Sequence, residues 1–282
     1  MASPPPLTQV TLTATSVADD LGYVALADLA DTIHDAPAGR YRIIGGHMVT
    51  ALVARWGLGG ELDRETRDTD LGAPPAVITG HQVVERLTAL GYERVEGNRF
   101  ARTVSDVPVR LAGAVTMSNR TEIDVLVPAY TSKPRQNRRV ADNLVTTEVP
   151  GLASALQRPP ITLDMDLHRL NGQKLHARLN FPDEVSALVL KAFATSVRMK
   201  GTDIIDVWRC LEIAFAAGVG PEAFANGEQA EAAALIRKLL AHRNTTAMKT
   251  LIDEQRLSPM AADQRHTRLT ALVGRVVGPH VA

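Results

Sequence analysis

The spacing of apolar and polar residues changes along the chain and predicts two structural units. Residues 1–181 combine stretches of helical apolar spacing with short runs in which apolar and polar residues alternate, a mixture typical of helices and strands. From residue 182 onward, almost every stretch has helical spacing alone. The pattern therefore predicts an α+β protein, with an α/β unit over residues 1–181 followed by a helical unit over residues 182–282.

The same pattern predicts individual elements within each unit. In the first unit, helices are expected over residues 17–34, 47–56 and 77–90, and short strands over residues 40–44 and 68–71. The alternating runs RFARTV, TEIDVLV, ITLDMDL and KLHARLNF predict further strands between residues 92 and 181. In the second unit, helices are expected over residues 184–198, 204–217, 228–242, 245–255 and 262–277, with a break at residues 218–221.

Composition narrows the class of protein without changing this picture. The chain is 45% hydrophobic and 22% charged with a formal net charge of zero, which is ordinary for a soluble globular protein. Its apolar stretches fall short of the roughly 18 residues that cross a bilayer, so no membrane partner is expected. The start of the chain lacks the pattern of a secretory signal, and the single Cys210 excludes an internal disulfide. These features predict a cytoplasmic protein, with Cys210 packed in a helical core.

A glycine pair separates the strand predicted at residues 40–44 from the following helix. Gly45 and Gly46 have no side chains, so a ligand can approach the backbone closely at this point. The first N–H groups of a helix lack partners within the helix and carry its positive dipole end, a combination that suits phosphate. The strand, glycine turn and helix together predict a site for a phosphate group.

Two aspartates occur on the next predicted strand, in the run RDTDL. Asp68 and Asp70 are two residues apart, so their side chains project from the same face of a strand. Carboxylate oxygens on a rigid strand suit magnesium, which requires hard ligands in near-octahedral geometry. Two such ions, about 3.5–4 Å apart, stabilise the attacking and leaving oxygens of a nucleotidyl transfer. The pair therefore predicts a magnesium site beside the phosphate site.

The run GGHMVTALVARWGLGGELDRETRDTDL resembles the first motif of the DNA-polymerase-beta-like nucleotidyltransferase superfamily. It is most similar to the AbiEii-type toxins, including the mycobacterial MenT group, which have a Gly-Gly, a helix and then an Arg-x-Thr-x-Asp-x-Asp pattern. Arg64, Thr66, Asp68 and Asp70 match that pattern residue by residue. The resemblance implies a polymerase-beta-like mixed sheet with flanking helices in the first unit.

A second block, LKAFATSVRMKGTDIIDVWRCLEI, resembles the later motif of the same toxins. Its matching positions are Lys191, Arg198, Asp203 and Asp206. The resemblance implies that Lys191 reaches the triphosphate as a point charge and that Asp206 orients Lys191 or takes part in catalysis. Asp203 is expected to cap the helix that begins near residue 204. The nucleotide-binding residues implied in this way are Gly45, Gly46, His47, Arg64, Thr66, Lys191 and Arg198.

The chain departs from the superfamily after the glycine pair. Many members have a serine there, whose hydroxyl contacts phosphate, whereas this chain has His47. The serine role therefore does not transfer, and His47 either contacts the triphosphate or has a capping or packing role.

A third metal-binding carboxylate is expected on a neighbouring strand. Asp124 in TEIDVLV is the preferred candidate, because an acid within an apolar strand is costly unless it has a partner. The alternative is Asp164 or Asp166 in ITLDMDL.

The resemblance implies the toxin of a bacterial toxin–antitoxin pair, with a cognate antitoxin as partner and the tRNA 3′ end as acceptor. Residues 133–139 form a predicted basic loop that could grip RNA phosphates through Lys133, Arg135, Arg138 and Arg139. The same chemistry on a protein hydroxyl, as in AMPylation, or on a small molecule is the nearest alternative. A catalytically inert nucleotide-binding protein on the same fold is the second.

Overall fold

The computed structural model describes residues 8–107, 119–131, 134–141, 144–197, 199–240 and 242–279. The chain is a mixed α+β protein, in agreement with the sequence pattern. It divides into two compact units, an N-terminal unit that ends at Pro182 and a C-terminal unit that begins at Asp183. No helix in the described ranges is long and apolar enough to cross a membrane.

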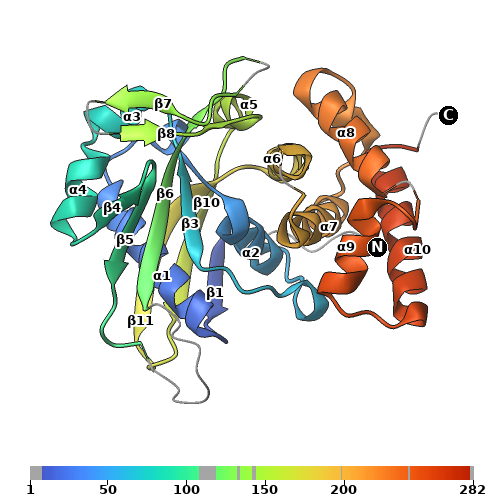
Figure 1. The fold of residues 1–282 in the computed structure, drawn as a ribbon, viewed down its shortest axis with the longest axis horizontal. Helices are drawn as coiled ribbons and strands as arrows, with labels where there is room; N and C mark the ends of the chain where they lie inside the picture. The colour runs from blue at the N-terminus through green and yellow to red at the C-terminus, as the bar shows by residue number, and fades with distance from the viewer. Residues whose placement is uncertain are drawn as a thin grey trace. The chain divides into compact units, whose positions relative to one another are not determined.

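The larger sheet of the N-terminal unit is mixed. Its strands are β2 (Arg42–Ile44), β3 (Asp68–Gly72), β4 (Glu93–Glu96), β5 (Arg99–Thr103), β6 (Arg120–Pro128) and β9 (Glu148–Val149). They follow the order β2-β3-β6-β5-β4, with β9 beside β6. Figure 1 labels β3, β6, β5 and β4 of this sheet. Strands β3 and β6 run parallel, while β2 and β5 are antiparallel to their neighbours β3 and β6. The central pair β3 and β6 therefore comes from distant parts of the sequence.

Two smaller sheets complete the strands of this unit. The first contains β1 (Gln9–Thr13), β10 (Ile161–His168) and β11 (Lys174–Phe181), with β1 parallel to β10 and β10 antiparallel to β11. The second is a hairpin of β7 (Arg138–Ala141) and β8 (Leu144–Thr146).

Helix α1 (Val17–Thr32) joins the two main sheets of the N-terminal unit. Its first turn is capped by Ser16, whose hydroxyl accepts a hydrogen bond from the Asp19 N–H. The helix contacts β3 and β6 of one sheet and β10 and β11 of the other, so it lies between them. Thr121 on β6 donates a hydrogen bond to the carbonyl of Leu21 at 2.7 Å. The core face of β6 thus packs on α1, which leaves the opposite face of β6 available for a site.

The other helices of this unit are shorter: α2 (Gly45–Arg55), α3 (Pro75–Gly80), α4 (Val83–Ala89) and α5 (Leu152–Gln157). Helix α2 follows β2 without a linker and packs against β1, β2 and β3. It is therefore fixed beside the strand that carries Asp68 and Asp70.

The C-terminal unit is helical, as the apolar spacing predicts. Its helices are α6 (Glu184–Val197), α7 (Gly201–Ala216), α8 (Gly227–Leu240), α9 (Thr246–Glu254) and α10 (Pro259–Val276). Helix α7 packs against α6, α9 and α10, which makes it the central helix of this unit. Cys210 lies on α7, is fully buried, and packs in the core as predicted.

The structure differs from the sequence prediction in several elements, including strand β1, which was not expected. The helix expected over residues 77–90 is two helices, because Gln82 takes a left-handed conformation with φ of 49°. Helix α2 begins at Gly45 itself, so the glycine pair is its first turn. Helix α7 begins at Gly201, so Asp203 lies inside it and is no cap. Arg138 and Arg139, expected in a loop, lie on strand β7.

Candidate functional site

Three aspartates meet on one face of the larger sheet. Asp68 and Asp70 lie on β3, and Asp124 lies directly opposite Asp70 on β6. One carboxylate oxygen from each residue lies within 4.8 Å of the others. Their exposure is graded, since Asp68 is exposed, Asp70 is half-buried and Asp124 is buried. The parallel register of two strands thus creates a compact cluster of oxygen ligands, which we call the aspartate triad.

The triad has the chemistry of a site for a hard divalent cation. Like charges opposite each other on neighbouring strands repel, so the cluster is costly unless a positive charge lies nearby. Carboxylate oxygens are the ligands that magnesium prefers, and three carboxylates on two rigid strands leave coordination positions for water or phosphate. Asp68, Asp70 and Asp124 therefore fit a magnesium ion and can hold a metal.

The start of α2 lies against the triad. Gly45 has a φ of 74°, a backbone conformation that residues with a side chain rarely adopt. A Cβ atom at this position would collide with the Asp70 carboxylate, which occupies the space directly beside the Gly45 backbone. Glycine is therefore required at residue 45 for two reasons, its backbone conformation and the close approach of Asp70. The first turn of the helix and the metal-binding carboxylate are in direct contact.

Gly46 lies against Arg64 and Thr66, the two residues of the Arg-x-Thr pattern. A Cβ at Gly46 would lie 2.5 Å from the Thr66 Cγ2 atom and 2.7 Å from the Arg64 Nη2 atom. Arg64 also donates a hydrogen bond to the Thr66 hydroxyl at 3.3 Å. Thr66 is held in turn by its N–H, which donates to Asp19 at 3.3 Å. The structure thus brings Arg64 and Thr66 to the glycine pair, and the guanidinium stands at the start of α2.

Helix α2 has no side-chain cap at its beginning. Ile44 occupies the cap position and offers no hydrogen-bond acceptor to the first turn. An N-terminal turn without a side-chain cap, flanked by the Arg64 guanidinium, is suited to an anion. The site therefore places an anion-binding helix start beside a cation-binding triad, which matches the two halves of a metal-bound phosphate.

His47 is buried in the N-terminal unit. Its side chain packs against Gly22 of α1, where a Cβ would collide with the imidazole, and its ring faces Tyr23 with centroids 6.4 Å apart. Only 1% of His47 is exposed, which favours a packing role over contact with the triphosphate. Burial also raises the pKa of the Tyr23 hydroxyl, with the Asp19 charge adding to the effect.

The third carboxylate has a partner that the sequence analysis did not single out. Arg99 on β5 donates to both oxygens of Asp124, from Nε at 3.0 Å and from Nη2 at 2.9 Å. This fork raises the pKa of the Arg99 guanidinium above its ordinary value, chiefly through the hydrogen bond to Asp124. The cross-strand register places Arg99 opposite Asp124, and the sequence alone does not give that register.

Asp164 and Asp166, the alternatives for the third carboxylate, lie on β10 in the other main sheet. There they face His176 on β11, whose Nδ1 atom is 3.4 Å from Asp166 Oδ1, and Arg178, whose Nε atom is 3.9 Å from Asp164 Oδ1. The structure therefore groups Asp124, and neither of these two, with Asp68 and Asp70.

Two of the predicted RNA-binding residues, Arg135 and Arg138, form ion pairs with Glu148. Arg135 and Arg138 both contact Glu148 Oε1 at 2.9 Å. Glu148 is buried, and these arginines together with the Arg135 N–H lower its pKa to about 2. Arg139 lies on β7, and Lys133 lies outside the described residues. Because Glu148 neutralises part of this charge, the segment attracts phosphate less than its sequence suggests.

Lys191 and Asp206 contact each other inside the C-terminal unit. The Lys191 Nζ atom lies 2.7 Å from Asp206 Oδ2 and 3.9 Å from Asp203 Oδ1, and Arg209 Nη1 lies 3.0 Å from Asp206 Oδ1. All four side chains are buried, and we call them the buried charge cluster. Arg198 lies outside the described residues. The implied contact of Lys191 with a triphosphate stays a prediction.

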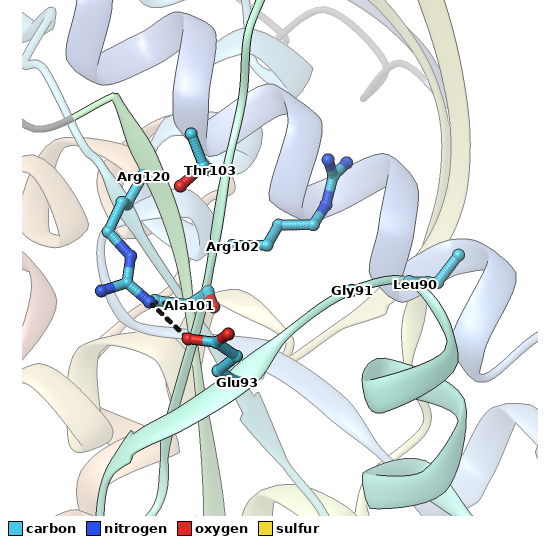
Figure 2. A pocket seen from close by; sticks show the side chains of 7 residues that line it. All are labelled: Leu90, Gly91, Glu93, Ala101, Arg102, Thr103 and Arg120. Carbon is cyan, nitrogen blue, oxygen red and sulfur yellow. Dashed lines mark hydrogen bonds and ion pairs between the residues drawn. The ribbon is translucent and has the colours of Figure 1, made fainter.

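A pocket of about 430 Å³ lies at the far end of β5 and β6 from Asp124 (Figure 2). Arg120 precedes Asp124 by four residues on β6, which corresponds to roughly 13 Å along a strand. In the pocket, Arg120 lies 3.7 Å from Glu93, and Arg102 points away from Arg120 and pairs with Asp28 at 2.7 Å. The pocket contains no residue of the triad, and its charges are already balanced.

Comparison with known proteins identifies no family. No protein-family model and no curated protein matches the chain. Among solved structures, the chain is similar to one described as an antigenic nucleotidyltransferase-like protein from Paracoccidioides brasiliensis. The sequences are 17% identical, the TM-score is 0.43, and the match covers 92% of this chain and 94% of that chain. A likeness this distant carries no inference about activity.

Proposed function

We propose that this protein is a magnesium-dependent nucleotidyltransferase, which transfers a nucleoside monophosphate from a nucleoside triphosphate to an acceptor hydroxyl. The observation that carries the proposal is the contact between the two halves of the site, with the Asp70 carboxylate against Gly45 at the start of α2. A metal-bound triphosphate requires carboxylates for the cation and open backbone N–H groups for phosphate oxygens in one place. The resemblance of residues 45–71 to the AbiEii-type motif supports the same chemistry.

One group of residues would bind magnesium, and another would bind the triphosphate. Asp68, Asp70 and Asp124 would hold magnesium, which supplies neutralisation of charge on the attacking and leaving oxygens. The backbone of Gly45 and Gly46 approaches the phosphate tail, and Arg64 adds a cation beside it. The acceptor oxygen attacks the α-phosphorus, the bond from that phosphorus to the bridging oxygen breaks, and pyrophosphate leaves with the electron pair. The acceptor proton passes to water.

RNA, specifically the tRNA 3′ end, is the acceptor that we propose, in the role of a toxin that is neutralised by an antitoxin. This part of the proposal rests on the resemblance to the AbiEii and MenT toxins. The Glu148 ion pairs of Arg135 and Arg138 favour a second candidate, a protein hydroxyl, because they reduce the positive charge offered to RNA.

The experiment that tests the proposal is transfer of label from each α-labelled nucleoside triphosphate, with magnesium, to total tRNA and to total protein. The variant Asp70→Asn removes one charge of the triad. The matched control is Asp164→Asn, which makes the same change in the Asp-x-Asp pair of β10. We expect wild type and Asp164→Asn to transfer label and Asp70→Asn to lose transfer.

The destination of the label decides between acceptors. Label in tRNA supports the toxin reading, which predicts growth arrest on expression that disappears in Asp70→Asn. Label in protein alone moves the acceptor to a side-chain hydroxyl. Binding of triphosphate and metal by folded protein, without transfer to either pool, would support the inert alternative and overturn the proposal.

A further inference from the structure

Asp124 is held by a cation of the chain itself. The two hydrogen bonds from Arg99 reach both carboxylate oxygens at 3.0 and 2.9 Å, the geometry of a strong fork-to-carboxylate pair. The Asp124 side chain is only 11% exposed, so the Arg99 fork contacts a largely buried carboxylate. The carboxylate that a metal would need as its third ligand is therefore already satisfied.

A divalent ion and the Arg99 fork compete at this carboxylate. Magnesium lies about 2.0–2.1 Å from its oxygen ligands, so an ion on Asp124 would stand next to the guanidinium. Repulsion between the two cations is strong at such short range in a half-buried site. An ion that binds alone must displace Arg99 or accept this repulsion.

Arg99 has a second carboxylate within reach. Glu122 precedes Asp124 by two residues on β6, so the two acids share a face, and the Arg99 Nη1 atom is already 3.7 Å from Glu122 Oε2. The Arg99 side chain is 37% exposed, so part of it borders solvent, where it can change conformation. Glu122 also lies 3.7 Å from Arg67 Nη2, which shows that its carboxylate lies among cations.

Resting on the proposed nucleotidyltransferase site, we propose that Arg99 is a resident counter-cation that weakens the binding of free divalent ions. It occupies Asp124 in the absence of ligands and shifts toward Glu122 when metal enters. A triphosphate brings several negative charges that offset the repulsion, so metal and nucleotide bind together far better than metal binds alone. Arg99 is thus a positioning residue that couples metal binding to nucleotide binding.

The test is a titration with Mn²⁺ followed by electron paramagnetic resonance, which detects bound metal without any reaction. We expect Arg99→Gln to bind free Mn²⁺ at least about tenfold more tightly than wild type, because the competing charge is gone. Arg99→Lys keeps the charge but loses the two-bonded fork, so its affinity for free Mn²⁺ should lie between those of wild type and Arg99→Gln. Arg67→Gln removes a neighbouring cation that contacts Glu122 and is the matched control, expected within about threefold of wild type.

A second titration contains a triphosphate analogue that cannot be cleaved. The advantage of Arg99→Gln should shrink to less than about threefold there, because the phosphates supply the missing neutralisation. If wild type binds Mn²⁺, Asp68→Asn does not, and Arg99→Gln binds no more tightly than wild type, the role of Arg99 is refuted while the metal site stands. If neither wild type nor Arg99→Gln binds Mn²⁺, with or without the analogue, the proposed site itself fails.

Discussion

The aspartate triad and the buried charge cluster use the same residue types for different ends. In the triad, three carboxylates lie close together, Arg99 pairs with Asp124, and Asp68 is exposed. In the cluster, Lys191 and Arg209 balance Asp203 and Asp206, and each is at most 5% exposed. We interpret the clustered acids at a partly exposed face as a ligand site, and the balanced charges in a core as a structural feature.

The two regions also differ in what holds the charged groups. The triad is placed by strand register, so its carboxylates keep their positions even when repulsion acts between them. The cluster is placed by mutual attraction between groups on α6 and α7, so each member depends on the others. Loss of one charge should therefore impair binding in the first region and folding in the second.

The largest expected effect is on activity in the triad. Asp70→Asn should lower nucleotidyl transfer by about 10³-fold or more, because one charged ligand of the site is lost. Its free energy of unfolding should change by less than about 1 kcal/mol, since the residue is half-buried and the amide has the same size. Transfer assays and urea unfolding of the same preparation check both. Retained activity would end the distinction between the two regions.

The next effect is on stability in the cluster. Asp206→Ala should destabilise the protein by about 3–5 kcal/mol, because Lys191 and Arg209 would stay buried without their shared carboxylate. Urea unfolding measures the loss. The paired replacement Lys191→Met with Asp206→Leu should recover the part of the loss that comes from Lys191, because Arg209 alone then stays buried without the Asp206 carboxylate. Equal loss in the single and paired variants would contradict the balanced-charge interpretation.

A smaller effect is expected on thermal stability in the presence of magnesium, and it should depend on the triad and not on the buried charge cluster. At 100 times its dissociation constant, a bound ion stabilises the native state by about 2.7 kcal/mol, which raises the melting temperature by roughly 5–10 °C. We expect this rise in wild type and in Lys191→Met, and none in Asp68→Asn. Differential scanning fluorimetry with and without magnesium is sufficient. A rise that persists in Asp68→Asn would place the ion elsewhere.

The smallest effect concerns Glu148, which pairs with Arg135 and Arg138 in the N-terminal unit. Glu148→Gln should cost about 1–2 kcal/mol, because charge-assisted hydrogen bonds from Arg135 and Arg138 are lost. The pKa of Glu148 is lowered from its ordinary value to about 2, so its contribution is present above about pH 4.5 and declines as the pH falls toward 2. Wild type and Glu148→Gln should therefore converge at low pH, while the exposed Glu96→Gln should match wild type throughout.

The alternating and helical patterns predicted most elements, and the helices of the C-terminal unit differ from prediction only at their ends. Periodicity reports which face is buried, so it locates long amphipathic helices well. It could not locate the break at Gln82, because a left-handed residue other than glycine leaves no local signal. Strand β1 was missed for a related reason, since its pairing with β10 depends on residues far along the chain.

The site was predicted in part, and the reason is again distance along the chain. Asp68 and Asp70 are neighbours in sequence, and strand geometry alone brings them together. The choice between Asp124 and Asp164 depended on which strand pairs with β3, which one sequence does not determine. The role of Arg99 was not predicted, because the sequence pattern does not distinguish this arginine from an ordinary exposed residue of an alternating strand. Its role depends on the register of β5 against β6.

The parallel pairing of β3 with β6 has a consequence for how the protein folds. Asp70 and Asp124 meet only after the long chain segment between them has closed into a loop, and such non-local contacts form slowly. We therefore expect the carboxylates of the triad to come together late in folding. A divalent ion should leave the refolding rate unchanged and slow the unfolding rate, because its ligands are together only in the native state.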